Sequence, residues 1–94
     1  MKDLIIFELN KLLDYARNLN MDCPYRLSLI DGLELLLKKI KEDRVVKEVR
    51  LRYLNYRLFI RINKWGEFIN IHVVLNNINR REEPIILDSK RVFN

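Results

Sequence analysis

The feature of this chain that most limits its fold is a change in the spacing of its apolar residues near Val45. Before Val45, apolar side chains recur every three or four residues, which is the period of a helix with one buried face. After Val45, they alternate with polar side chains, which is the period of a strand with one buried face. The sequence therefore predicts helices first and an antiparallel sheet second, in an α+β fold.

Two helices are predicted before the change. The first covers about residues 4–19, with Asp3 as a candidate N-cap, and the chain then breaks the pattern around Pro24. The second covers about residues 29–42. Each helix has an apolar stripe on one side, so both are expected to pack against the same side of the sheet.

The start of the second helix contains two residues of interest. Ser28 followed by Asp31 forms a candidate capping box, in which the serine hydroxyl accepts a hydrogen bond from a backbone N–H group at the helix start. Gly32 then lies inside the helix, at a cost of about 1 kcal/mol relative to alanine. Either Gly32 allows another segment to approach closely, or it marks a weak first turn.

Three strands are predicted after the change, each with an apolar and a polar face. Their apolar residues are Val49, Leu51 and Tyr53, then Tyr56, Leu58, Ile60 and Ile62, then Ile69, Ile71, Val73 and Leu75. The short gaps at Leu54-Asn55 and Trp65-Gly66 predict two antiparallel hairpins. We expect these residues in particular to be buried under the helices: Leu51, Leu58, Ile60, Ile71 and Val73.

The two turns also predict which residues lie opposite each other. A turn at residues 54–55 places Leu51 opposite Leu58. A turn at residues 65–66 places Ile62 opposite Ile69. Both hairpins then place their large aliphatic side chains on one side of the sheet, and a slip of one residue would break this agreement.

The remainder of the chain predicts a short edge strand and a tail. Ile85, Ile86 and Leu87 follow Pro84, which is tolerated at the start of an edge strand. The 94 residues suit a single domain, divided into a helical hairpin over 1–43, a sheet over 44–88 and a tail over 89–94. The tail is expected to be loose unless Val92 and Phe93 dock.

The positive charge of the chain lies in its second half. The net charge is +5. Residues 44–94 contain eleven Lys and Arg against five Asp and Glu, whereas residues 1–43 contain seven against eight. This asymmetry indicates a face that attracts a polyanion or an acidic protein.

The predicted register gathers this charge on the polar face of the sheet. The candidate nucleic-acid-binding residues on this face are Arg50, Arg52, Arg57, Phe59, Arg61, Asn70 and His72. They fall in three rows, namely Glu48-Arg61-Asn70, Arg50-Phe59-His72 and Arg52-Arg57-Val74. Guanidinium groups pair well with phosphates, and an aromatic ring among them can stack on an unpaired base. Arg52 opposite Arg57 is a like-charge pair that a bound anion would relieve.

The same face also fits a structural interpretation. Arginine is common on exposed strands, Glu48 opposite Arg61 is an ordinary cross-strand pair, and Phe59 can be covered by the tail or by a second copy of the chain. His72, the only histidine, is more often a surface residue than a catalyst in such a position. Arg80 and Arg81 are followed directly by two glutamates. This favours a self-satisfied loop, in which the glutamates neutralise the arginines, over a loop that binds phosphate.

Several classes of protein are excluded by what the sequence lacks. It has no glycine-rich phosphate loop, and its single Cys23 and single histidine supply no zinc ligand set, so we expect no cofactor, no metal site and no assigned catalytic residue. The apolar run over 4–7 ends at Glu8, which is too short for a signal peptide or a membrane span. We therefore expect an intracellular, cytoplasmic location, inside the host cell if the protein is viral.

Three functions remain open. The first is a small non-enzymatic module that contacts single-stranded RNA or DNA through the sheet. The second is a viral or phage-type accessory protein that binds or inhibits a host protein. The third is a small metal-independent ribonuclease in which His72 acts as a general acid or base. Leu27 and Leu35 lie outside the main stripe of the second helix, and they predict a homodimer.

The order of a helical hairpin followed by a basic antiparallel sheet resembles that of RelE-type ribonuclease toxins. Those toxins begin with a strand that this chain lacks. The resemblance is one of fold order alone, so it implies no role for any particular residue.

Overall fold

The computed structural model describes residues 2–44 and 46–92. Its elements are α1 (Lys2–Arg17), α2 (Arg26–Lys41), β1 (Glu48–Tyr53), β2 (Tyr56–Trp65), β3 (Phe68–Asn77) and β4 (Ile85–Asp88). The four strands form one antiparallel sheet in the order β1-β2-β3-β4. The predicted α+β fold, with a helical hairpin before the sheet and a short fourth strand at its edge, is confirmed.

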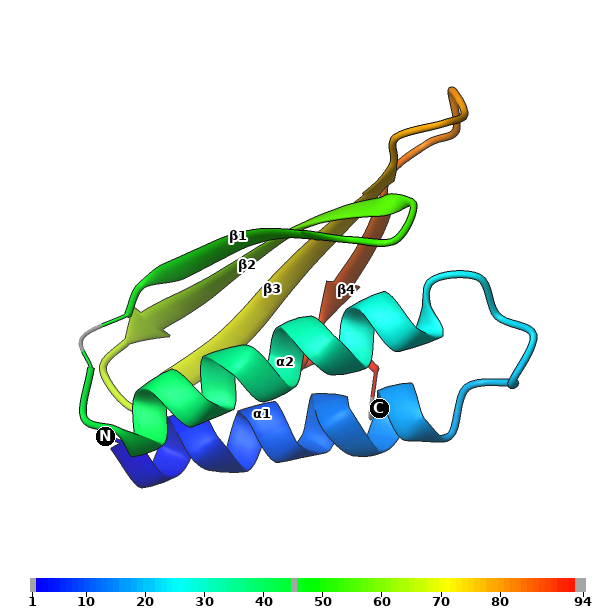
Figure 1. Ribbon diagram of the computed structural model, residues 1–94. Helices are drawn as coiled ribbons and strands as arrows, with labels where there is room; N and C mark the ends of the chain where they lie inside the picture. The colour runs from blue at the N-terminus through cyan, green and yellow to red at the C-terminus, as the bar shows by residue number, and fades with distance from the viewer. Residues whose placement is uncertain (1, 45, 93–94) are drawn as a thin grey trace.

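The molecule has two layers. Figure 1 shows α1 and α2 side by side on one face of the twisted sheet, while the opposite face is left uncovered. We call this uncovered side the open face. Of the five sheet residues predicted to be buried, Leu58, Ile60, Ile71 and Val73 are buried against the helices. Leu51 is half-buried instead, because it lies on the edge strand β1, which has a neighbouring strand on one side only.

Gly32 is the point at which α2 lies closest to the sheet. A methyl group built on its Cα would lie 2.8 Å from Leu58 Cδ2 and 3.2 Å from Ile60 Cδ1. Real side chains do not pack this tightly, so the missing side chain allows the close approach. Of the two interpretations of Gly32, close packing is therefore the one that the structure supports.

Both helices begin earlier than predicted. α1 begins at Lys2, so Asp3 lies in its first turn and is not an N-cap. α2 begins at Arg26, and Tyr25 at its N-cap position makes no side-chain capping bond. Ser28 is therefore inside the helix, and the predicted capping box with Asp31 is wrong. The Ser28 side chain faces the sheet, where its hydroxyl donates a 2.9 Å hydrogen bond to the backbone carbonyl at the end of β1.

The turn between β2 and β3 also differs from the prediction. Trp65 pairs with Phe68, so the two turn residues are 66–67, with Gly66 at a φ of 60°. A positive φ at the first turn residue is typical of a type II′ hairpin, which favours glycine there. Ile62 consequently lies opposite Ile71, two residues from the predicted partner. An even shift leaves every side chain on its predicted face.

The turn between β1 and β2 lies at the predicted position. Tyr53 pairs with Tyr56, and Leu51 lies opposite Leu58, as expected. The residue with positive φ is Leu54, at 55°, although asparagine adopts this conformation more readily. Asn55 uses both its backbone carbonyl and its side chain in hydrogen bonds with the loop between β3 and β4.

The segment after β4 is docked up to Val92. Ser89 is fully buried, and its N–H donates to the carbonyl of Ile71 while its hydroxyl accepts from the N–H of Ile71. The tail was predicted to be loose unless Val92 and Phe93 dock. Val92 does pack against the core, and Phe93 lies outside the described residues. Within residues 2–44 and 46–92, neither helix is long and apolar enough to cross a membrane.

Candidate nucleic-acid interface

The observed strand pairing places three rows of side chains on the open face. They are Glu48-Arg61-His72-Asp88, Arg50-Phe59-Val74-Ile86 and Arg52-Arg57-Asn76. The predicted rows were correct for β1 and β2, whereas those for β3 were wrong by two residues because the hairpin turn lies one residue later. His72 thus lies opposite Arg61 instead of Phe59, and Asn70 lies opposite Asn63.

The first row is balanced in charge. The Glu48 carboxylate lies 3.4 Å from the guanidinium of Arg61 and 3.8 Å from that of Arg50. All three side chains are exposed, so these ion pairs are screened by water and weak. Their main effect is local, since one carboxylate reduces the positive field of two arginines at this end of the face.

Phe59 lies between the same two arginines. The guanidinium carbons of Arg50 and Arg61 lie 5.0 Å and 5.2 Å from the centre of its ring, within the range of cation–π contact. The ring is half-buried. Planar cations thus already lie over this ring, and both of them can themselves stack on a base.

Asn70 and His72 are tied to the end of β4. The Asn70 amide donates a 2.8 Å hydrogen bond to Asp88 Oδ1, and His72 Nδ1 lies 2.9 Å from the same oxygen. The Asn70 carbonyl oxygen accepts the N–H of Lys90 at 3.2 Å. Both predicted site residues thus use part of their hydrogen-bonding capacity to hold the C-terminal segment against β3.

Asp88 is held as a carboxylate. Burial favours its neutral form, but the hydrogen bonds from Asn70 and His72 and the nearby charges of His72 and Arg91 outweigh burial, so the pKa of Asp88 lies below its usual value. An ionised carboxylate only accepts hydrogen bonds, which assigns the proton of the contact to His72 Nδ1. In the neutral imidazole the other ring nitrogen, Nε2, is then an acceptor, whereas in the imidazolium both nitrogens are donors. Residue spacing alone does not indicate this partner of His72.

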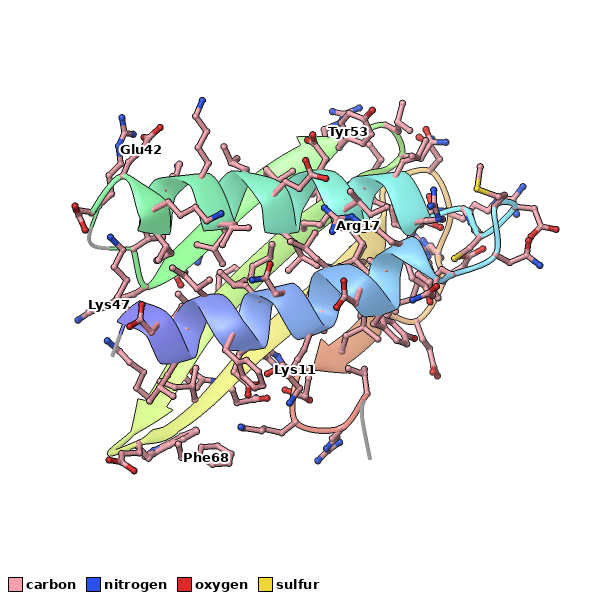
Figure 2. All side chains as sticks on the ribbon, turned by 90° about the horizontal axis from the view of Figure 1, so that it is seen from below. Lys11, Arg17, Glu42, Lys47, Tyr53 and Phe68 are labelled. Carbon is pink, nitrogen blue, oxygen red and sulfur yellow. The ribbon has the colours of Figure 1, made fainter. Side chains whose placement is uncertain are left out.

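A second carboxylate, Glu8 on α1, anchors the same segment. Glu8 is buried, and its Oε1 lies 2.8 Å from Lys90 Nζ and 3.4 Å from Lys11 Nζ. Burial opposes its ionisation, but hydrogen bonds from Lys90 and Ser89 and the two lysine charges keep its pKa below the usual value. Figure 2 shows Lys11 on the side of α1 near this segment. The sequence pattern did not single out Glu8.

The third row carries the least neutralised charge of the open face. Arg52 and Arg57 lie directly opposite each other, as predicted, and both are exposed. In the part of the chain that the structure describes, neither forms an ion pair. They line a hollow of about 400 Å³ together with Arg50, Leu51, Leu58, Phe59 and Asn76. This hollow brings three of the predicted arginines and the predicted aromatic residue together.

The described side chains provide no candidate metal site. Across residues 2–44 and 46–92, no group of three or more His, Cys, Asp or Glu is placed to hold a metal ion. Comparisons of the chain with protein-family models, with curated proteins and with solved structures give no match. Functional inference therefore depends on the geometry of the open face.

Proposed function

We propose that the protein binds single-stranded nucleic acid on the open face of its sheet, with Arg52 and Arg57 as the main phosphate contacts. The observation that carries this proposal is the hollow in which two arginines without ion-pair partners among the described residues lie beside an aromatic ring. Two like charges held opposite each other repel, and a phosphate placed between them removes the repulsion. Binding is thus favoured by relief of a repulsion that exists in the free protein.

The other residues of the face have secondary roles in this proposal. Arg50 and Arg61 both form an ion pair with Glu48, so each attracts the phosphate backbone less strongly than an unpaired arginine would. Phe59 stacks on one base, with the adjacent guanidiniums extending the platform. Asn70 and His72 fix the edge of the face through Asp88. A stacking platform favours a single strand, because the bases of a duplex are already stacked on each other.

Titration of labelled RNA and DNA oligonucleotides at several salt concentrations tests the proposal. We expect the affinity to fall steeply with salt, and each of Arg50, Arg52, Arg57 and Arg61 changed to glutamine should lower the salt slope by about one unit or less. Phe59→Ala should cost about 1–3 kcal/mol for a single strand and much less for a duplex. Fluorescence anisotropy measures both quantities.

Phe7→Ala is the matched control for the aromatic substitution. Phe7 is 62% exposed on α1, on the helical side of the molecule, so its replacement should leave the affinity unchanged. Equal losses in the Phe7 and Phe59 variants would mean that stacking on Phe59 is not part of binding. No binding of wild-type protein to RNA or DNA at low salt would contradict the proposal as a whole.

A second candidate function, metal-independent RNA cleavage, is favoured by the contact between His72 and Asp88. A general base needs a group that orients it, and the contact of Asp88 with His72 Nδ1 leaves Nε2 as the acceptor in the neutral imidazole. In this proposal, Nε2 takes the proton of a ribose 2′-hydroxyl and the 2′-oxygen bonds to the adjacent phosphorus. The bond from phosphorus to the 5′-oxygen then breaks, and water supplies the proton to that oxygen. Arg61, opposite His72, stabilises the charge on phosphorus.

Cleavage of RNA in the presence of EDTA tests this second candidate. We expect products with 2′,3′-cyclic phosphate and 5′-hydroxyl ends, and a fall of about 100-fold or more in rate for His72→Ala. Asn63→Ala, on the same face but outside the row of His72, should cleave at the wild-type rate. Equal rates for wild type and His72→Ala would assign any cleavage to a contaminant and leave binding as the function.

The protein-partner and homodimer predictions from the sequence stay proposals, as does the intracellular location. Leu27 and Leu35, which carry the dimer prediction, are 53% and 37% exposed on α2. Apolar side chains at such positions favour a second copy as the partner of this surface, and light scattering measures the mass directly. An acidic host protein would contact the same arginines as a nucleic acid, but its binding would depend less steeply on salt.

A further inference from the structure

The loop between β3 and β4 forms a second hollow at the end of the sheet. This hollow has a volume of about 520 Å³, and its polar lining consists of Arg57, Asn76, Asn77, Asn79, Arg80 and Arg81. It adjoins the hollow on the open face, because Arg57 and Asn76 line both. Among the described residues, no carboxylate lines it. A strand lying over Arg52 and Arg57 can therefore continue directly into it.

This loop is held in place by the turn between β1 and β2. The backbone carbonyl of Asn55 accepts the N–H of Ile78 at 2.9 Å, and its side-chain oxygen accepts the amide of Asn79 at 2.8 Å. The N–H of Asn79 donates to Asn77 Oδ1 at 2.9 Å, which tightens the bend. Figure 1 shows the loop projecting beyond the sheet next to that turn. The contacts with Asn55 fix the base of the loop, and so the position of the hollow relative to Arg57.

One of the three arginines that line the hollow, Arg80, has a carboxylate partner among the described residues. The nearest approach of Arg80 to Glu82 is 3.9 Å between exposed side chains, which is a weak pair. Within the described ranges, Arg81 and Arg57 form no ion pair. The guanidiniums of Arg57 and Arg81 therefore line the hollow without an ion pair among the described residues.

We propose that this hollow holds one nucleotide of the bound strand, with its phosphate at Arg57 and Arg81 and the edge of its base at Asn76. The inference rests on the proposed function. Guanidinium forks match phosphate oxygens, and an asparagine amide can both donate to and accept from a base edge. Asn76 is exposed and lies opposite Arg57 on the open face.

The consequence is a base preference that the sheet alone does not provide. Phosphate contacts position a strand without reading its sequence, and stacking on Phe59 accepts any base. Hydrogen bonds to a base edge do discriminate. Asn76 thus supplies the selectivity of the complex, whereas Arg52, Arg57 and Phe59 supply its affinity.

Binding of twelve-residue A, C and U homopolymers by a set of four variants tests the inference. We expect wild type to prefer one of the three by about tenfold over the weakest, and Asn76→Ala to remove this preference. Arg81→Gln should weaken all three by a similar factor of about ten, since it removes a phosphate contact. Asn55→Ala keeps the charge and releases the loop, so it should also reduce the preference. Lys38→Gln, on α2, is the charge-matched control for Arg81→Gln and should match wild type.

The outcomes separate this inference from the proposed function. If wild type binds the homopolymers but Asn76→Ala and Arg81→Gln bind all three as wild type does, the hollow is not a nucleotide site and the open face remains the interface. If wild type binds no homopolymer at low salt, the proposed function fails. A titration with AMP and UMP, followed by NMR, then tests the hollow alone. Shifts confined to residues 76–81 and the Arg57 side chain would support a site for a free nucleotide, and their absence would overturn it.

Discussion

Changing Arg52 and Arg57 together to glutamate is expected to weaken the binding of single-stranded RNA or DNA by about 100-fold or more at low salt. Removing the phosphate interaction of each arginine accounts for about a factor of ten, and each new carboxylate adds repulsion of the strand. The fold should not change, because both side chains are exposed and one like-charge pair replaces another. Anisotropy titration measures the affinity, and circular dichroism checks the fold.

The matched control is the pair Lys38→Glu and Lys41→Glu. It changes the net charge by the same amount on α2, which lies on the opposite side of the sheet from the arginines. A small decrease is expected from the change in overall field, far below that of the arginine pair. If the two double variants weaken binding equally, net charge and not the open face accounts for binding. If the arginine variant binds RNA and DNA as wild type does, the open face is not the nucleic-acid interface. If wild type itself binds neither at low salt, a protein partner becomes the better interpretation.

The faces of the strands could be predicted from the sequence even where the register could not. The prediction placed the second turn at Trp65-Gly66, and the structure places it one residue later. The β3 partners of the residues in β2 then change by two, but the alternation of side chains has a period of two. Arg57, Phe59 and Arg61 consequently stay on the open face. Turn chemistry decides the register, and periodicity decides the face.

The contacts that modify the site could not be predicted in this way. Asp88 meets His72 across two strands, and Lys90 meets Glu8 over a separation of 82 residues. Each pair depends on the positions of two elements that local patterns place only approximately. A charged residue on an apolar stripe was the available signal for Glu8, because a buried carboxylate requires a partner of opposite charge.

Ser28 shows how a local signal can be overridden by tertiary structure. A serine with an acid three residues later is a common helix start, but α2 begins two residues before Ser28. The hydroxyl instead bonds the carbonyl of Tyr53, which lies at the end of an edge strand. The Ser28 side chain is fully buried, and a buried hydroxyl without a partner would cost about 1–3 kcal/mol, comparable with the gain from an N-cap. The sequence shows the donor and does not show which of these hydrogen bonds it makes.

Changing Gly32 to valine is expected to lower the free energy of unfolding by about 2–3 kcal/mol, the largest effect on stability that we predict. The new side chain has no room, because even a single methyl group would lie 2.8 Å from Leu58 Cδ2. Overpacking of a filled core costs about 1–3 kcal/mol, and valine recovers only a few tenths of this through its better helix propensity than glycine. Denaturation in urea, monitored by circular dichroism, measures the difference.

Two variants separate packing from helix propensity. Gly32→Ala adds one carbon and gains about 1 kcal/mol of helix propensity, so it should lie close to wild type. Asp31→Val places the same β-branched side chain at an exposed position of α2 and should change the stability by less than about 0.5 kcal/mol. If Gly32→Val is as stable as wild type, α2 does not lie this close to β2. The β1–β2 hairpin that carries Arg52 and Arg57 would then lack the support on which the proposed interface depends.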